Sequence, residues 1–154
     1  MDIAIYLMLA LKNQWSLSGS AISPQNTVFT TKWYSDTVVS PQITVSALDD
    51  THTVVETGQF PVNYIAYDYG VDIWFRPPNE SGTSYGSAKD AMYQARKEVI
   101  RIIRGLGIIT VNASPEFPVI RGWHNLNETK LRPVLFRTNI AVRTYRYKDA
   151  FDTT

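Results

Sequence analysis

The sequence predicts an α+β fold in which a mainly antiparallel sheet packs against one long amphipathic helix and a short N-terminal helix. Three observations lead to this class: an apolar stripe at helical spacing, stretches of alternating apolar and polar residues around it, and a short apolar run at the N-terminus. The 154 residues contain no repeat, low-complexity tract or linker. We therefore expect residues 1–154 to form a single α+β domain.

Residues 2–14 are predicted to form the short helix. Nine consecutive apolar residues lie between Asp2 and Lys12, whose charges suit the helix dipole. A membrane span needs about 20 apolar residues, and a signal peptide has positive charge ahead of its apolar run, so we expect neither. A helix that is apolar nearly all round is either clamped within its own chain or half buried in a neighbouring subunit. Ile3 and Leu7 are the candidates for contact with a neighbour.

Several strands are predicted ahead of the long helix. Thr27–Tyr34 is rich in β-branched and aromatic residues. Gln42–Leu48 alternates between apolar and polar residues, which predicts a half-buried strand. Residues 54–55 suggest a short returning strand, and Val62–Arg76 a longer one with Gly70 at a bulge or turn.

The long helix is the clearest element. Its apolar residues recur every three or four positions and form one stripe: Ala88, Ala91, Met92, Ala95, Val99, Ile102, Ile103 and Leu106. Ser87, three residues before Asp90, resembles a capping box, and Gly105 and Gly107 supply a stop. The pattern therefore predicts a helix over 87–104 with one side packed on the sheet.

Further strands are predicted after this helix. Ile108–Val111 and Val119–Trp123 are short, and Val134–Tyr147 is long. In the last strand the alternation places one set inward: Val134, Phe136, Thr138, Ile140, Val142 and Thr144. The opposite set faces the other way: Arg137, Asn139, Arg143, Tyr145 and Tyr147.

Catalytic chemistry has little support in this composition. There is no cysteine, and the two histidines, His52 and His124, lie in a predicted turn and loop. Asp68 and Asp72 have the only spacing that pairs two carboxylates, and a small-molecule enzyme would need them to converge with a histidine in one pocket. Solvent-facing acids are the commoner case. We expect no enzyme, no cofactor and no metal site.

Charge is distributed unevenly along the chain. Residues 1–88 carry three basic side chains against eight acidic ones, whereas residues 89–154 carry twelve against six. If the halves form different faces, the surface is dipolar and suits head-to-tail self-association. If strands from both halves interleave in one sheet, the dipole vanishes. The sequence leaves both alternatives open.

The basic half supplies the candidate contact residues. The long helix carries Arg96, Arg101 and Arg104 away from its apolar stripe, and the last strand carries Arg137, Arg143, Tyr145, Arg146 and Tyr147. Arginine interleaved with tyrosine suits both nucleic acid and protein interfaces. The pI of about 7.9 is below the range typical of dedicated nucleic-acid domains. An ordinary solvated surface is the remaining alternative.

The order of elements resembles the tail-completion, tail-terminator and neck proteins of tailed bacterial and archaeal viruses. The features that prompt this comparison are the Asp2–Lys12 helix, the Ser40-Pro41-Gln42-Ile43-Thr44-Val45 strand, the Ser87–Arg104 helix and the closing Arg137–Tyr145 stretch. The resemblance covers most of the chain as an arrangement of elements and rests on no invariant signature.

This resemblance implies a structural virion protein at the head–tail junction. Such a subunit forms a ring, typically of six copies, that terminates the tail tube or joins it to the connector. Its partners would be copies of itself, the tail-tube protein and neck or connector proteins, with a passing contact with viral DNA and none with a membrane. Its place would be the virion tail or neck, and the host cytoplasm during assembly. The alternative function is a nucleic-acid-binding α+β domain that uses the Arg/Tyr-rich C-terminal half.

Overall fold

The computed structural model has the expected α+β architecture. It describes residues 2–18, 22–36, 41–48, 53–56, 63–77, 81–111, 114–127 and 134–148. The order of elements in these ranges is α1 (Ile3–Gln14), β1 (Val28–Thr30), β2 (Gln42–Ala47), β3 (Thr53–Glu56), β4 (Asn63–Phe75), α2 (Gly82–Gly105), β5 (Ile109–Val111), β6 (Ser114–Asn125) and β7 (Phe136–Lys148). The returning strand expected at residues 54–55 is confirmed as β3.

The described strands form one seven-stranded sheet in the order β1-β2-β4-β7-β6-β5, with β3 pairing β4 beyond the end of β2. All pairs are antiparallel except β1 and β2. The centre is the ladder between β4 and β7, which pairs thirteen residues from Asn63↔Lys148 to Phe75↔Phe136. Strands from the acidic and basic halves of the chain are therefore neighbours in the middle of the sheet.

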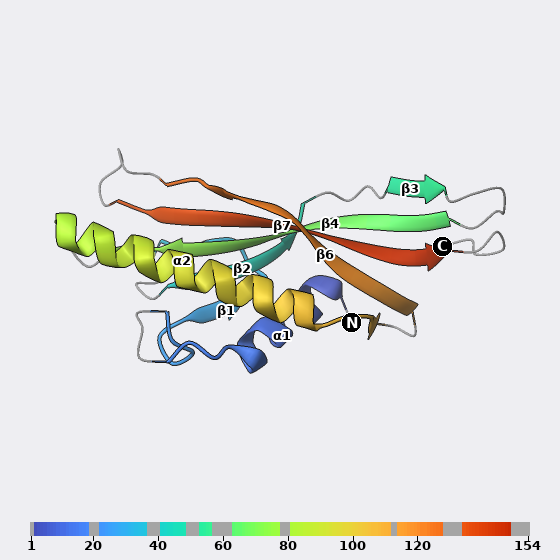
Figure 1. The fold of residues 1–154 in the computed structure, drawn as a ribbon, viewed down its shortest axis with the longest axis horizontal. Helices are drawn as coiled ribbons and strands as arrows, with labels where there is room; N and C mark the ends of the chain where they lie inside the picture. Colours follow the sequence, from blue (N-terminus) through green and yellow to red (C-terminus); the bar gives the residue numbers. More distant parts are fainter. Residues whose placement is uncertain are drawn as a thin grey trace.

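Both helices cover the same face of the sheet, here called the helix-covered face (Figure 1). The apolar stripe predicted on α2 is confirmed, because its residues are buried or half-buried against strand residues such as Ile73, Phe136 and Ile140. α1 adds Leu7 and Leu11, both fully buried. The ends of β4 and β7 that pair with each other beside β3 extend past the helices (Figure 1).

The long helix begins earlier than the sequence suggested. Ser81, not Ser87, is its N-cap, and the Ser81 side chain accepts a hydrogen bond from the Ser84 amide. A serine cap satisfies a backbone donor of the first turn, and this gain outweighs the low helix propensity of Gly82 and Gly86. At the other end Gly107 has a φ of 61°, a left-handed conformation that suits the chain reversal after a helix.

On the face of the sheet opposite the helices, here called the second face, the burial of β2 differs from the expectation. Gln42 and Thr44 on β2 are buried, although a solvent-facing polar side was expected. The reason is that Trp33 and Tyr34 pack against Trp74 of β4, whose indole N–H donates to the Thr44 hydroxyl at 3.0 Å. A tertiary contact from a loop has therefore closed this part of the second face.

Three strand details also need correction. β1 covers only residues 28–30 of the predicted 27–34, and β6 is much longer than the predicted 119–123. Gly70 is neither a bulge nor a turn, because it pairs in regular register with Ser46 and Ala141. The lack of a side chain at Gly70 leaves room for Leu48, whose Cδ2 atom would lie 2.9 Å from an added Cβ. The register shift lies instead in β6, between Ile120 and Gly122.

Substitution on the two sides of α1 tests the position of this helix. Leu7→Ala should lower the free energy of unfolding by about 2–5 kcal/mol, because it leaves a cavity at a fully buried position. Asn13→Ala, at an exposed position of the same helix, should cost less than about 1 kcal/mol. Urea unfolding of both variants measures the difference, and equal losses would contradict the described packing of α1.

Candidate functional site

Arg137 of β7 lies on the second face of the sheet and is held by its neighbours. Its guanidinium Nε donates to Asp72 Oδ1 at 2.9 Å, and the Asp72 side chain is only 1% exposed. The guanidinium carbon lies 4.5 Å from the ring centre of Trp74 and 5.2 Å from that of Trp33. Asn139 donates to the same aspartate oxygen at 3.0 Å. The guanidinium of Arg137 is therefore held in place, and its charge is largely offset by Asp72.

Arg143 and Asp68 form a second ion pair across the same ladder. Arg143 donates from Nε to Asp68 Oδ1 at 2.8 Å and from Nη2 to Asp68 Oδ2 at 3.2 Å. The hydrogen bond to Asp68, with a smaller effect from Tyr145, raises the pKa of the Arg143 guanidinium. Both acids that the sequence singled out thus pair with separate arginines instead of sharing one catalytic pocket.

The candidate contact residues at the end of β7, Tyr145, Arg146 and Tyr147, alternate between the two faces of the sheet. Tyr145 stacks on Phe117 of β6 with ring centres 5.3 Å apart. Arg146 points by strand alternation to the helix-covered face and lies opposite Glu116 in the register. Burial raises the pKa of Glu116, and the charge of Arg146 counteracts part of that shift. Tyr147 pairs with Tyr64 through the backbone, and its side chain lies outside the described residues.

These pairs decide between the two alternatives for the surface charge. Strands of the acidic and basic halves interleave, and Asp68 and Asp72 face Arg143 and Arg137 across one ladder. Of the two alternatives, the structure favours interleaved halves over two oppositely charged faces, because opposite charges are paired within the sheet. The basic side chains that remain together lie on α2.

The outer surface of α2 gathers cations and aromatic rings beside β6. The Arg96 guanidinium lies 4.8 Å from the ring centre of Trp123 and 5.1 Å from that of Tyr93. The Lys97 ammonium lies 5.3 Å from the Tyr93 ring. A groove of about 360 Å³ is lined here by Tyr93, Arg96, Lys97, Ile100, Arg101, Arg104 and Trp123. Of the arginines expected to make contacts, Arg96, Arg101 and Arg104 are thus brought to one place.

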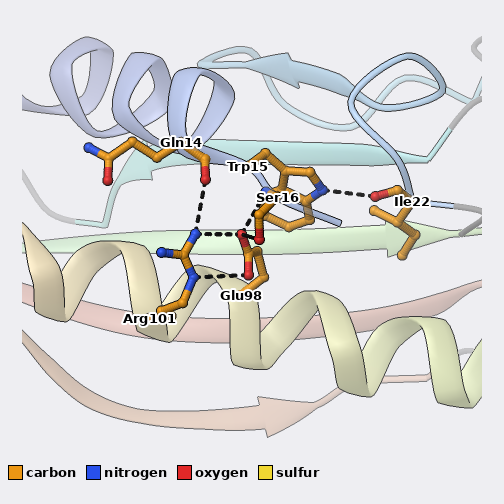
Figure 2. Close-up of polar contacts among 6 residues, drawn as sticks. All are labelled: Gln14, Trp15, Ser16, Ile22, Glu98 and Arg101. Carbon is orange, nitrogen blue, oxygen red and sulfur yellow. Dashed lines mark hydrogen bonds and ion pairs between the residues drawn. The ribbon is translucent and has the colours of Figure 1, made fainter. Parts of the chain in front are cut away.

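Arg101 also joins this surface to the end of α1 (Figure 2). It donates to both oxygens of Glu98, and its Nη2 donates to the Gln14 carbonyl at 2.9 Å. Glu98 Oε1 in turn accepts from the amide and the hydroxyl of Ser16, each at 2.8 Å. Beside them Trp15 donates its indole N–H to the Ile22 carbonyl at 2.8 Å. This set of bonds fixes the chain leaving α1 against the C-terminal half of α2.

The carboxylate of Glu98 is stabilised by these partners. Burial by itself would raise its pKa, but hydrogen bonds from Arg101 and from Ser16 outweigh burial and lower the pKa below the ordinary value for glutamate. The charged form is therefore favoured in the folded protein, although the residue is only 6% exposed.

Ile3 and Leu7, the candidate contact residues of α1, are buried in the core of the protein. The surface available to a partner therefore does not include them. The opposite side of α1 exposes Ile5 and Leu9, which are 39% and 36% accessible. Sequence reasoning missed these two residues, although the all-round apolar character of the helix implied that its outer side would also be apolar.

The histidines are the remaining candidates that the sequence analysis weighed for catalysis or metal binding. His124 is exposed on β6 and lies opposite Asn139 in the register, and His52 lies outside the described residues. Within the described ranges there is no group of three or more His, Cys, Asp or Glu side chains able to hold a metal ion. Neither described helix is long and apolar enough to cross a membrane.

The chain was compared with protein-family models and with curated proteins. No protein-family model matches the chain, and no curated protein matches it significantly.

The pKa of Glu98 leads to a pH-dependent prediction. Because the folded-state pKa is lowered, the stabilisation is present above the unfolded-state pKa, about 4.3, and is lost as the pH falls through the folded-state value. At pH 7, Glu98→Gln should lower the free energy of unfolding by about 1–3 kcal/mol. This deficit should shrink as the pH falls from 7 to below the unfolded-state pKa, because the wild-type carboxylate then becomes protonated as well.

Urea unfolding of both proteins across this pH range measures the deficit. The matched control is Asp90→Asn, an exposed acid on the same helix, which should change stability by less than about 0.5 kcal/mol. A Glu98→Gln deficit that stays constant down to the lowest pH would contradict the assigned role of the carboxylate.

Proposed function

We propose that this chain is a non-enzymatic structural subunit that assembles head to tail with copies of itself. The observation that carries the proposal is the outer side of α1. Ile5 and Leu9 are one helical turn apart, and both are exposed although the helix has no polar side before Lys12. A helix with this composition is normally covered on all sides, so its outer side calls for a partner.

The second face of the sheet offers a surface to meet it. Away from Trp33 and Tyr34, neither of the two described helices covers this face. Val119 and Leu48 are exposed there, and the stacked pair of Phe117 and Tyr145 is half-exposed. The charges of Arg143 and Asp68 in this region are paired with each other, so burying this pair isolates neither charge.

The positions of the two surfaces favour a heterologous contact. α1 packs on the helix-covered face, and its outer side points away from the sheet. Val119 lies on the second face, on the other side of the sheet. A contact between two different surfaces on opposite sides of a subunit repeats from copy to copy, and it produces a closed ring when the rotation between copies closes. Apolar surface, and not charge complementarity between the two halves of the chain, would drive this assembly.

The viral role comes from the resemblance in element order and is proposed on that ground. The ring, typically of six copies, would lie at the head–tail junction of a tailed virus and terminate the tail tube or join it to the connector. Its further partners would be the tail-tube protein and neck or connector proteins, and its location the virion, after assembly in the host cytoplasm. Edges and exposed aromatic residues such as Trp33 suit contacts with such neighbours.

Light scattering across protein concentration tests the assembly. The wild-type protein should form a discrete multimer, near six times the 17.5 kDa of one chain. The α1 variant Ile5→Glu/Leu9→Glu and the sheet variant Val119→Glu should each remain monomeric with unchanged circular dichroism, because each places charge in an apolar contact.

Mixing the two variants tests the head-to-tail geometry. Each variant keeps one intact surface, so the mixture should give a species of twice the single-chain mass and nothing larger. The control Ile108→Glu changes an apolar residue that is 74% exposed and outside both surfaces, and it should assemble like the wild type. A wild-type protein that stays monomeric at every concentration, or α1 variants that assemble normally, would contradict the proposal.

A further inference from the structure

We propose that the outer surface of α2 beside β6 is a binding site for single-stranded nucleic acid. This proposal is independent of self-assembly, because the residues that carry it lie on neither of the two apolar surfaces. It also places the site on α2 and β6, whereas the sequence drew attention equally to the arginines of β7.

The site extends along most of the helix. A second groove, of about 350 Å³, adjoins the first and shares Tyr93 and Arg96 with it. It is lined further by Lys89, Met92, Asn125, Asn127, Phe136 and Thr138. From Lys89 to Arg104 the helix rises about 22 Å, which is long enough for several nucleotides of an extended strand. The two grooves therefore form one strip with Arg96 at its centre.

The charge of this strip suits a phosphate backbone. Its lining includes five cations, Lys89, Arg96, Lys97, Arg101 and Arg104, and no acidic residue. Glu98 offsets part of the charge of Arg101, whereas Lys97 and Arg104 are exposed. A row of cations along one edge binds polyanions through phosphate contacts and counterion release.

The aromatic residues favour a single strand over other polyanions. Tyr93 and Trp123 are 46% and 43% exposed, so part of each ring is open to solvent within a row of cations. Unpaired bases stack on such rings and on guanidinium planes, whereas the bases of a duplex are already stacked on each other. The Arg96 guanidinium, held over both rings, is fixed in place for a phosphate or a base.

The arginines of β7 are poorly suited to this role. Arg143 is engaged by both oxygens of Asp68, and Arg137 by a buried aspartate and two tryptophan rings. Releasing either guanidinium to a phosphate would leave an aspartate without its partner. The α2 cations Lys97 and Arg104 carry no such cost.

Fluorescence anisotropy with a labelled oligothymidylate of about 20 nucleotides tests the proposal. The wild-type protein should bind at about 50 mM salt and lose affinity steeply as salt rises to about 200 mM. Lys97→Gln/Arg104→Gln should weaken binding by about tenfold or more at low salt. It should also reduce the slope of log K against log salt by about 1.4, since two phosphate contacts are lost. Trp123→Ala should weaken binding by about tenfold through lost stacking.

Matched variants separate a site from general attraction by charge. Lys12→Gln/Lys32→Gln removes the same charge from exposed positions outside the grooves and should change affinity by less than about threefold. Arg143→Gln should likewise leave binding unchanged, because that guanidinium is committed to Asp68. Thermal unfolding of each variant confirms that it is folded.

Four results would overturn the proposal. These are no binding of the oligothymidylate by the wild-type protein, an equal loss in the groove and control variants, tighter binding of a duplex of the same length, and groove-dependent binding of a poly-glutamate peptide in place of the oligothymidylate. The last result would assign the groove to an acidic protein partner.

Discussion

The antiparallel ladder between β4 and β7 is the constraint on which the other features of this protein depend. It pairs thirteen residues from the two halves of the chain, and it is flanked by β2 and β3 on one side and β6 on the other. On its helix-covered face it supplies Ile73, Ile140 and Phe136 to the core. On its second face it sets Asp72 beside Arg137 and Asp68 beside Arg143. The pairing of β4 with β7 thus determines both where the helices pack and which acidic and basic side chains form ion pairs.

The neutralisation within this ladder determines which surfaces remain for function. With two arginines of β7 engaged by β4, the cations of α2 form the basic strip that persists among the described residues. The apolar surfaces lie elsewhere, on the outer side of α1 and on the second face of the sheet. Arg101 hydrogen-bonds the Gln14 carbonyl at the end of α1, so the basic strip borders the surface proposed for self-assembly. Assembly and nucleic-acid binding would therefore occupy adjacent surfaces of one subunit.

Local patterns in the sequence predicted the elements, and tertiary contacts decided what the patterns left open. The apolar stripe of α2 and the alternation of β7 are repeated over many residues, so both were predicted correctly. The burial of Gln42 and Thr44 was not predictable, because it depends on Trp33 and Tyr34 returning over Trp74 from a loop. The N-cap at Ser81 was missed because the two glycines after it carry no helical signal.

The candidate contact residues divide in the same way. The sequence pattern identified Arg96, Arg101 and Arg104 as a group, because helical spacing alone places them away from the apolar stripe. It did not show that Arg137 and Arg143 pair with Asp72 and Asp68, because these partners on β4 are more than sixty residues away in the sequence. On α1 it chose Ile3 and Leu7, whereas Ile5 and Leu9 are the exposed pair, because an apolar run without polar residues does not reveal which side faces inward.

A double-mutant cycle between Asp72 and Arg137 tests the central ladder most directly. Asp72→Asn, Arg137→Met and the double variant would be unfolded with urea alongside the wild type, and their free energies of unfolding compared. A coupling of about 1–3 kcal/mol is expected, because each side chain is the buried or half-buried partner of the other. Additive losses, with a coupling below about 0.5 kcal/mol, would show that the two charges do not depend on each other and would contradict the neutralisation of the basic half by β4.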